Sequence, residues 1–236
     1  IKAVLEPDAQ RANKVRAMLP GIALYNDMDR MLKNEQLDFV DICSPPCTHK
    51  QYITEACCAG LHVLCEKPLV CSVAELREVA DVAKKHRRVV FTVNNWKYSP
   101  LWQQTANILN QDRIGPLRSI SLSVLRLAGS GGGATNWRRC PEIAGGGIMV
   151  DHGWHHLYLI NSCIREVPLG VSAKMVCKKH NGSSLDETVD LRVKFSKAEA
   201  NLHLTWQADE RKNFGIITGE KGWIKIADDH IIVCID

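Results

Sequence analysis

A carboxylate and an imidazole are spaced so that they can exchange a proton on one face of a helix. Asp151 and His155 stand four residues apart in a helical pattern that follows Gly145–Gly147, and residues at this spacing share a helix face. A carboxylate beside an imidazole orients the ring and stabilises its charged form, as an acid–base pair requires. Gly153 lies between them and costs about 1 kcal/mol of helix stability relative to alanine, which predicts a close approach of another group there.

A second set of charged residues directly follows an apolar strand pattern. Glu66, Lys67 and Pro68 come immediately after His62–Cys65, at the kind of strand end that carries chemistry, and the proline fixes the backbone there. A lysine that is partly desolvated and lies beside another positive charge has a lowered pKa, and it could pass a proton near neutral pH. An ordinary surface ion pair is the alternative for this segment.

Two further segments are candidate contacts for a dinucleotide. Glu6 ends the first strand pattern, where dinucleotide-binding folds place an acid that binds the ribose hydroxyls. Ser44, Pro45 and His49 follow the strand pattern 39–43 and open a helix, and ligands of open α/β sheets bind at this end of the strands. A surface glutamate and a capped strand-to-helix turn are the alternatives.

The elements that must position these residues alternate in the first part of the chain. Short apolar runs alternate with helical patterns, which predicts a doubly wound, parallel α/β sheet of the Rossmann type. Ser72 and Glu75 form a capping box at one helix start. The expected strands are 2–5, 39–43, 62–65 and 89–93, and the expected helices are 7–18, 28–34, 49–59, 73–86 and 99–113.

The pattern changes after Gly115 and Pro116, so we expect two domains, 1–116 and 117–236. Strand patterns joined by turns predict an α+β domain with a large, open, mostly antiparallel sheet. One helix is expected over 145–163, and a loop at Gly129–Gly133. The expected later strands are 167–177, 188–195, 200–207, 214–218, 223–226 and 231–234.

Composition excludes several classes of protein. The net charge of +4 is spread out, and its one dense cluster, Lys84–Arg88, has no aromatic residues beside it, so we expect no nucleic-acid partner. No apolar run reaches the roughly 18 residues that span a bilayer. The ten cysteines include no C-x-x-C pair, which predicts reduced thiols and a cytoplasmic location. His152 and His156 also lie four apart, but no third ligand accompanies them, so no metal is expected.

In combination, these motifs resemble the Gfo/Idh/MocA family of oxidoreductases, and the resemblance runs along almost the whole chain. Glu66-Lys67-Pro68 matches the family's E-K-P, and Asp151-x-Gly153-x-His155 matches its D-x-G-x-H after a glycine run. Other segments that resemble the family are Asn95–Pro100, Asn136–Arg138, Trp206 and Gly219–Gly222.

The resemblance implies hydride transfer between a nicotinamide cofactor and a secondary alcohol or ketone of a sugar, polyol or related small molecule. It implies NAD or NADP as cofactor, with NAD slightly favoured by Glu6. Lys67 would contact both the nicotinamide side and the substrate hydroxyl, His155 would be the general base, and Asp151 would hold the imidazole. The further residues it implies are Ser44, Pro45, His49, Glu66, Pro68 and Asn95 for the cofactor, and Lys97, Arg138 and Trp154 for the substrate.

One departure from the family pattern is large. The family begins with a strand and a G-x-G-x-x-G turn whose amides bind the pyrophosphate, and this sequence has no such motif. We therefore expect an N-terminally incomplete nucleotide domain that binds dinucleotide poorly as it stands. A truncated, non-enzymatic binding or regulatory protein is the alternative. Under both interpretations the resemblance implies a homo-oligomer formed through the C-terminal sheet, and the enzyme requires Lys67 and His155 to meet across a shared crevice.

Overall fold

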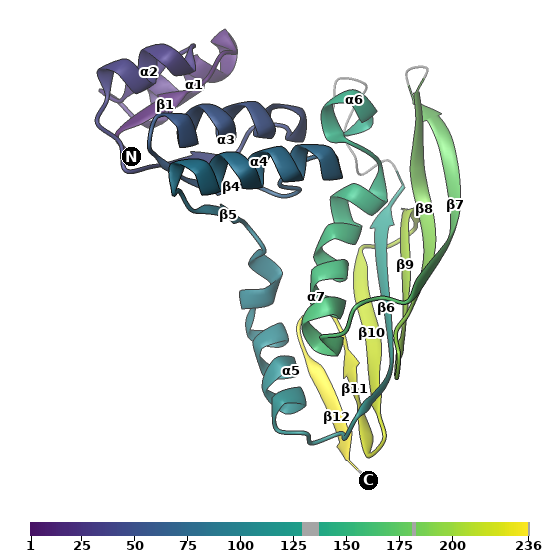
Figure 1. Cartoon of the computed structure of the whole chain (residues 1–236). Coiled ribbons are helices and arrows are strands. Elements are labelled where there is room, and N and C mark those ends of the chain that lie inside the picture. The colour runs from purple at the N-terminus through teal and green to yellow at the C-terminus, as the bar shows by residue number, and fades with distance from the viewer. Residues whose placement is uncertain (129–136, 181–182, 236) are drawn as a thin grey trace. The chain divides into compact units, whose positions relative to one another are not determined.

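The computed structural model describes residues 1–128, 137–180 and 183–235 (Figure 1). It consists of two compact units, Ile1–Val93 and Asn94–Asp236. This division precedes the expected boundary at Pro116 because helix α5 (Pro100–Asn110) places Trp102 and Ile108 in the core of the second unit. The expected loop at Gly129–Gly133 lies outside the described residues, as does Asn136.

Parallel strands in the first unit form two sheets where the sequence predicts one. Strand β1 (Ala3–Leu5) pairs with β2 (Ala23–Tyr25), and β3 (Phe39–Ile42), β4 (His62–Cys65) and β5 (Val90–Thr92) pair in that order. All of these pairs are parallel, as predicted. The sequence analysis did not predict β2.

The helices of the first unit are α1 (Ala9–Met18), α2 (Met28–Asn34), α3 (His49–Cys58) and α4 (Val73–His86). Side-chain caps mark the starts of α1, α2 and α4, where Asp8, Asp27 and Ser72 each accept a backbone amide, whereas α3 has no side-chain cap. The Ser72 hydroxyl accepts the amide of Glu75, and the Glu75 carboxylate accepts the amide of Cys71, so the predicted capping box is present. In Figure 1, α3 and α4 lie side by side next to β4.

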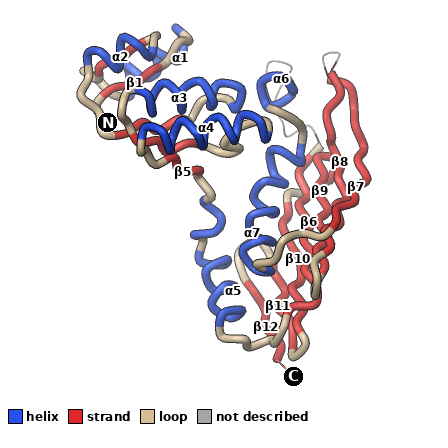
Figure 2. The backbone as a smooth tube through the Cα atoms, in the orientation of Figure 1, coloured by secondary structure: helices blue, strands red, loops and turns tan. Residues whose placement is uncertain are grey.

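A seven-stranded sheet dominates the second unit (Figure 2). Its strand order is β12-β11-β10-β6-β9-β8-β7, and every neighbouring pair is antiparallel except β6 with β9. This is the mostly antiparallel sheet that the sequence predicts. The strands are β6 (Leu117–Leu127), β7 (Gly170–His180), β8 (Ser183–Lys194), β9 (Glu199–Ala208), β10 (Lys212–Gly219), β11 (Gly222–Ile226) and β12 (Ile231–Ile235).

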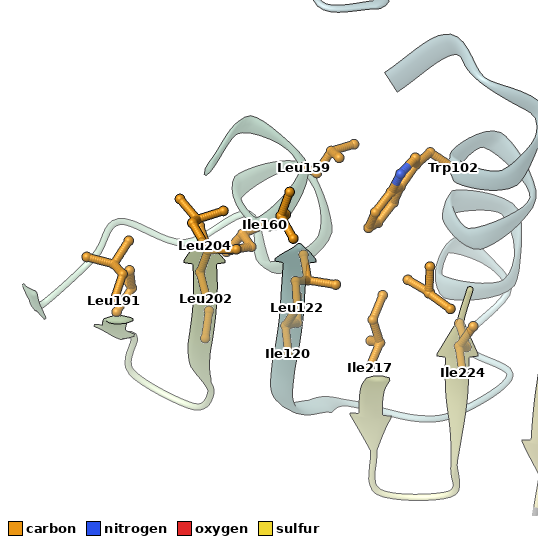
Figure 3. Packing of buried hydrophobic residues seen from close by; sticks show 14 of the residues in the cluster. Trp102, Ile120, Leu122, Leu159, Ile160, Leu191, Leu202, Leu204, Ile217 and Ile224 are labelled. Carbon is orange, nitrogen blue, oxygen red and sulfur yellow. The ribbon is translucent and has the colours of Figure 1, made fainter. Parts of the chain in front are cut away.

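Helices cover one face of this sheet and bury its apolar residues. Along β6 the alternation is strict, because Ile120, Leu122 and Val124 are buried while the serines between them are not. Figure 3 shows Ile120 and Leu122 beneath Leu159 of helix α7 (Trp154–Ile164) and Trp102 of α5. In the described part of the chain, no helix is long and apolar enough to cross a membrane.

The helix expected over 145–163 starts later, at Met149, with a π-helical turn, and a separate short helix precedes it. A short helix α6 (Pro141–Ala144) ends at Gly145, whose φ of 81° is left-handed. A π-helical turn, η4 (Met149–Gly153), follows the glycines and continues directly into α7. Such π-turns are frequent at functional sites, and this one contains Asp151.

Candidate functional site

A carboxylate from the sheet anchors the start of the helical segment that carries the predicted acid–base residues. The Asp186 side chain accepts the amides of Gly147 and Met149, each at 2.8 Å. A side chain at Gly147 would collide with the Asp186 backbone and carboxylate, so this position requires glycine. A negative charge also stabilises the N-terminal end of a helix.

A β-bulge in β8 lies beside Asp186. Val176 stands opposite Thr188 and Cys177 opposite Asp186, so Glu187 has no opposite residue. Bulges re-aim side chains next to functional sites. Sequence spacing could not find Asp186, because it lies 39 positions after the glycine whose amide it binds.

Gly153 permits a close approach, as predicted, but the approaching groups belong to the protein. A Cβ at this position would lie 2.7 Å from the Met149 sulfur and 3.2 Å from Leu204 Cδ1. The glycine therefore lets the helix pack against its own preceding turn and against the sheet. This packing sets the height of His155 above the sheet.

The His155 ring is held on its face and at its edge. It is 7% exposed and stacks on the Trp96 ring with centroids 4.8 Å apart and planes within 9°. Its Nδ1 lies 3.0 Å from the Tyr158 hydroxyl. The imidazole therefore has a fixed orientation, as a group that binds a reacting atom requires.

Tyr158 is itself fixed by the backbone of the short helix η2 (Asn95–Tyr98). The Trp96 amide donates to the Tyr158 oxygen at 3.1 Å. Burial raises the pKa of Tyr158 to about 12, against the opposing effect of the Trp96 and Lys97 amides. The phenol therefore keeps its proton at physiological pH. Tyr158 lies three residues after His155 on the same helix face, so the helical spacing alone could have predicted this contact.

Asp151 lies in the π-turn, half-buried and one turn before His155. Its Oδ2 is 3.6 Å from Nε2 of His152. The nearby Arg126 is only 5% exposed, and its guanidinium donates to the Asn213 side chain at 2.9 Å. Burial lowers the pKa of Arg126, and the charge of Asp151 counteracts part of that shift. The sequence analysis did not single out Arg126, which occupies a core-facing position of β6.

His156 is a packed core residue. It is 2% exposed, and its Nδ1 bonds the His152 carbonyl oxygen at 3.0 Å. Burial lowers the pKa of His156 to about 4. This ring is therefore neutral at physiological pH.

The residues of the second unit that are expected to bind the substrate differ in their exposure and in their contacts. The Trp154 indole N–H donates to the Asn94 side chain at 3.0 Å, so Asn94 makes the contact next to the predicted Asn95, which is exposed. Lys97 is exposed. Arg138 lies in the short helix η3 (Trp137–Arg139), with its guanidinium 4.4 Å from the centre of the Trp137 ring.

In the first unit, Glu66, Lys67 and Pro68 follow β4 as predicted. The Glu66 amide donates to the Ile42 carbonyl at 2.9 Å, which extends the pairing of β3 and β4. The Glu66 carboxylate accepts the Lys67 amide at 3.1 Å, and the Lys67–Pro68 peptide bond is cis. Lys67 is half-buried at the carboxyl end of the parallel strands.

His49 joins the two loops at this end of the sheet and does not face a ligand. The ring is fully buried, and its two nitrogens lie 2.8 Å from the backbone oxygens of Pro68 and Ser44. The Ser44 hydroxyl is 2.6 Å from that of Thr48, which donates to the Pro45 carbonyl at 2.8 Å. Both ring nitrogens therefore brace the two loops, and a contact of His49 with a cofactor stays a prediction.

Glu6 lies at the carboxyl end of β1, where the sequence analysis expects a ribose contact. Its Oε1 accepts the Asp8 amide at 2.9 Å, and its Oε2 is 3.1 Å from Nε of Arg11. The Glu6 side chain is 19% exposed and that of Arg11 is 66% exposed. The positively charged Arg11 therefore lies beside the Glu6 carboxylate, whereas the sequence analysis considered the charge of Glu6 by itself.

Parallel strands of the Rossmann kind and a large, mostly antiparallel sheet define the fold class, and the comparisons give the family. The chain belongs to the GFO/IDH/MocA oxidoreductase family. Residues 1–94 match the model described as oxidoreductase family, NAD-binding Rossmann fold, and residues 102–225 match the GFO/IDH/MocA C-terminal domain. The family that the motifs predict is thereby confirmed.

Individual relatives share the fold at low sequence identity. An uncharacterized oxidoreductase of Synechocystis sp. is 30% identical over 161 residues, covering 66% of this chain and 43% of that protein. The D-xylose 1-dehydrogenase (NADP(+)) 2 of Haloferax volcanii is 30% identical over 148 residues, covering 62% and 44%. The structure of levoglucosan dehydrogenase with NADH and levoglucosan superposes with a TM-score of 0.88 at 21% identity, covering 99% of this chain and 66% of that chain. Both sequence matches cover less than half the length of the relative.

Proposed function

We propose that this protein is an NAD(P)-dependent dehydrogenase that transfers a hydride between a nicotinamide cofactor and a secondary alcohol or ketone of a sugar, polyol or related small molecule. The observation that carries the proposal is the fixed imidazole of His155, stacked on Trp96 and bonded to Tyr158. The relatives named for action on D-xylose and crystallised with levoglucosan support a carbohydrate-like substrate.

The first unit has suitable groups for a nicotinamide dinucleotide. Glu6, the Ser44 loop and Glu66 all follow parallel strands at their carboxyl ends, where open α/β sheets bind ligands. The bridge from His49 to both loops fixes the backbone around Ser44 and Pro68. These residues would hold the dinucleotide, which when bound supplies the hydride acceptor or donor.

In this proposal, the opposite charges of Glu6 and Arg11 decide whether NAD or NADP is bound. A free Glu6 carboxylate would repel a 2′-phosphate, whereas an arginine nearby accommodates one. Arg11 lies beside Glu6 and is largely exposed. We therefore propose that both NAD and NADP be treated as candidate cofactors, and the two charges give a direct way to separate them.

We propose that Lys67, Asp151 and His155 bind the reacting hydroxyl and handle its proton. Lys67 stands at the strand end of the first unit, and Asp151 and His155 lie on consecutive turns of the second. Trp154, Lys97 and Arg138 are the further candidates for binding the rest of a polyhydroxylated substrate. Arginine and aromatic side chains suit sugars because they combine hydrogen-bond donors with apolar faces.

The direct test is a cofactor titration followed by turnover. NADH and NADPH binding to the chain is measured by fluorescence, and oxidation is then assayed with a panel of aldoses, polyols and anhydrosugars. Lys67→Met and His155→Asn should each lower kcat at least about 100-fold, the usual size of an acid–base contribution. Lys50→Met is the matched control, because Lys50 forms only a surface ion pair with Glu78.

The outcomes separate the two interpretations of the sequence. Unchanged turnover in both active variants would remove the proposed roles. A folded chain that binds neither dinucleotide at millimolar concentration would favour the non-enzymatic binding or regulatory protein.

We also propose that a second copy of this chain covers the open face of the large sheet. A shallow hollow of about 440 Å³ lies on this face, and Ile216 and Phe214 remain 37% and 39% exposed on the neighbouring strand β10. The hollow carries both signs of charge, from Asp190 and Arg192 among others. Mixed charges beside apolar residues are self-complementary across a twofold axis.

A further inference from the structure

We infer that Tyr158 is a positioning residue that fixes the proton of neutral His155 on Nε2. The inference deepens the proposed function, because it assigns His155 the role of hydrogen-bond donor to the substrate oxygen. The Tyr158 phenol oxygen makes the hydrogen bonds on which the tautomer depends.

A tyrosine hydroxyl has one proton to donate and two lone pairs that accept. The Trp96 amide donates to the Tyr158 oxygen at 3.1 Å, whereas the Lys97 amide donates to the Asn94 carbonyl at 3.2 Å. One accepting position of the phenol oxygen is then occupied by a backbone donor, which cannot act as an acceptor. The phenol proton therefore needs an acceptor on another side of the oxygen.

Nδ1 of His155, at 3.0 Å, is the acceptor that the described residues offer to this proton. A nitrogen that accepts a hydrogen bond carries no proton, so a neutral imidazole must carry its proton on the other nitrogen, Nε2. The stacked Trp96 ring restricts the plane of the imidazole. The tautomer of His155 is thus set by a side chain of its own helix.

The tautomer changes the role that the resemblance implies for His155. A general base must offer a bare nitrogen, whereas Nε2 of this imidazole already bears a proton. His155 then donates a hydrogen bond to the substrate oxygen. In oxidation, a bound nicotinamide would accept the C–H electron pair as hydride, the O–H pair would become part of the new C=O bond, and a group other than His155 would take the hydroxyl proton.

Nitrogen NMR of the chain with ¹⁵N-labelled histidine tests the inference without cofactor or substrate. The His155 signals are assigned by their loss in His155→Gln. Near pH 8 we expect His155 Nδ1 to resonate as an unprotonated nitrogen and Nε2 as a protonated one. A proton on Nδ1 would overturn the inference and would leave the proposed dehydrogenase activity untouched.

A matched pair of tyrosine variants separates positioning from general stability. Tyr158→Phe removes the donor to Nδ1, so the Nδ1–H tautomer should become populated and kcat should fall about tenfold, the effect of one lost hydrogen bond. Tyr98→Phe removes a hydroxyl from an exposed residue and should change neither the tautomer nor kcat. An unchanged His155 tautomer in folded Tyr158→Phe would refute the role of Tyr158.

Discussion

The contact between Asp186 and the helix start makes a quantitative prediction for stability. Asp186→Ala leaves the buried amides of Gly147 and Met149 without their acceptor. Each unsatisfied buried donor costs about 1–3 kcal/mol. Because Asp186 is 9% exposed and Met149 only half-buried, the lower half of the combined range applies, and we expect a loss of about 3 kcal/mol in the free energy of unfolding.

Urea unfolding followed by tryptophan fluorescence measures this loss, since Trp154 belongs to the affected helix and Trp96 stacks on its His155. In a chain of this size the same loss should lower Tm by about 6–12 °C. Asp190→Ala is the matched control on the same strand, because Asp190 forms an exposed pair with His203 that is worth about 0–1 kcal/mol.

A further variant separates the hydrogen bonds from the shape of the side chain. Asp186→Asn keeps the size and one accepting oxygen, so it should lie between the wild type and Asp186→Ala. Equal stabilities of Asp186→Ala and Asp190→Ala would refute the reasoning, since the helix start would then not depend on the carboxylate.

Three further perturbations test other parts of the structure. Because the pKa of His156 falls from 6.5 to about 4 on folding, the unfolded chain binds one more proton than the folded chain between these pH values. The free energy of unfolding should therefore have its full value above pH 6.5 and fall by about 3 kcal/mol as the pH drops to 4. His156→Leu should lack this pH dependence, which urea unfolding at each pH measures. Arg11→Ala should weaken NADPH binding about tenfold relative to NADH and Glu6→Gln should do the reverse, and titrations giving equal ratios for both variants would contradict the charge argument. Ile216→Lys should dissociate the proposed oligomer, as measured by light scattering after size exclusion. Leu76→Lys, at a first-unit residue that is 45% exposed against 37% for Ile216, should not. A monomeric wild type would exclude the interface.

The sequence alone determined the features that depend on local spacing. The alternation along 117–127 placed Ile120 and Leu122 on one face of a strand and the serines on the other, because a strand repeats every two residues. Capping residues fixed the start of α4 at Val73. The helical pattern also placed Asp151 and His155 on consecutive turns of one helical segment.

Only the tertiary structure decided which distant residues meet these elements. The Trp96 amide reaches the Tyr158 hydroxyl across 62 positions, and Asp186 reaches Gly147 across 39. Periodicity gives the face on which a side chain lies but not its partner, because the partner depends on how loops close and how helices pack on the sheet. For the same reason Trp102 joined the second core, and the imidazole that the sequence proposed as a base was found with its Nδ1 against a phenol.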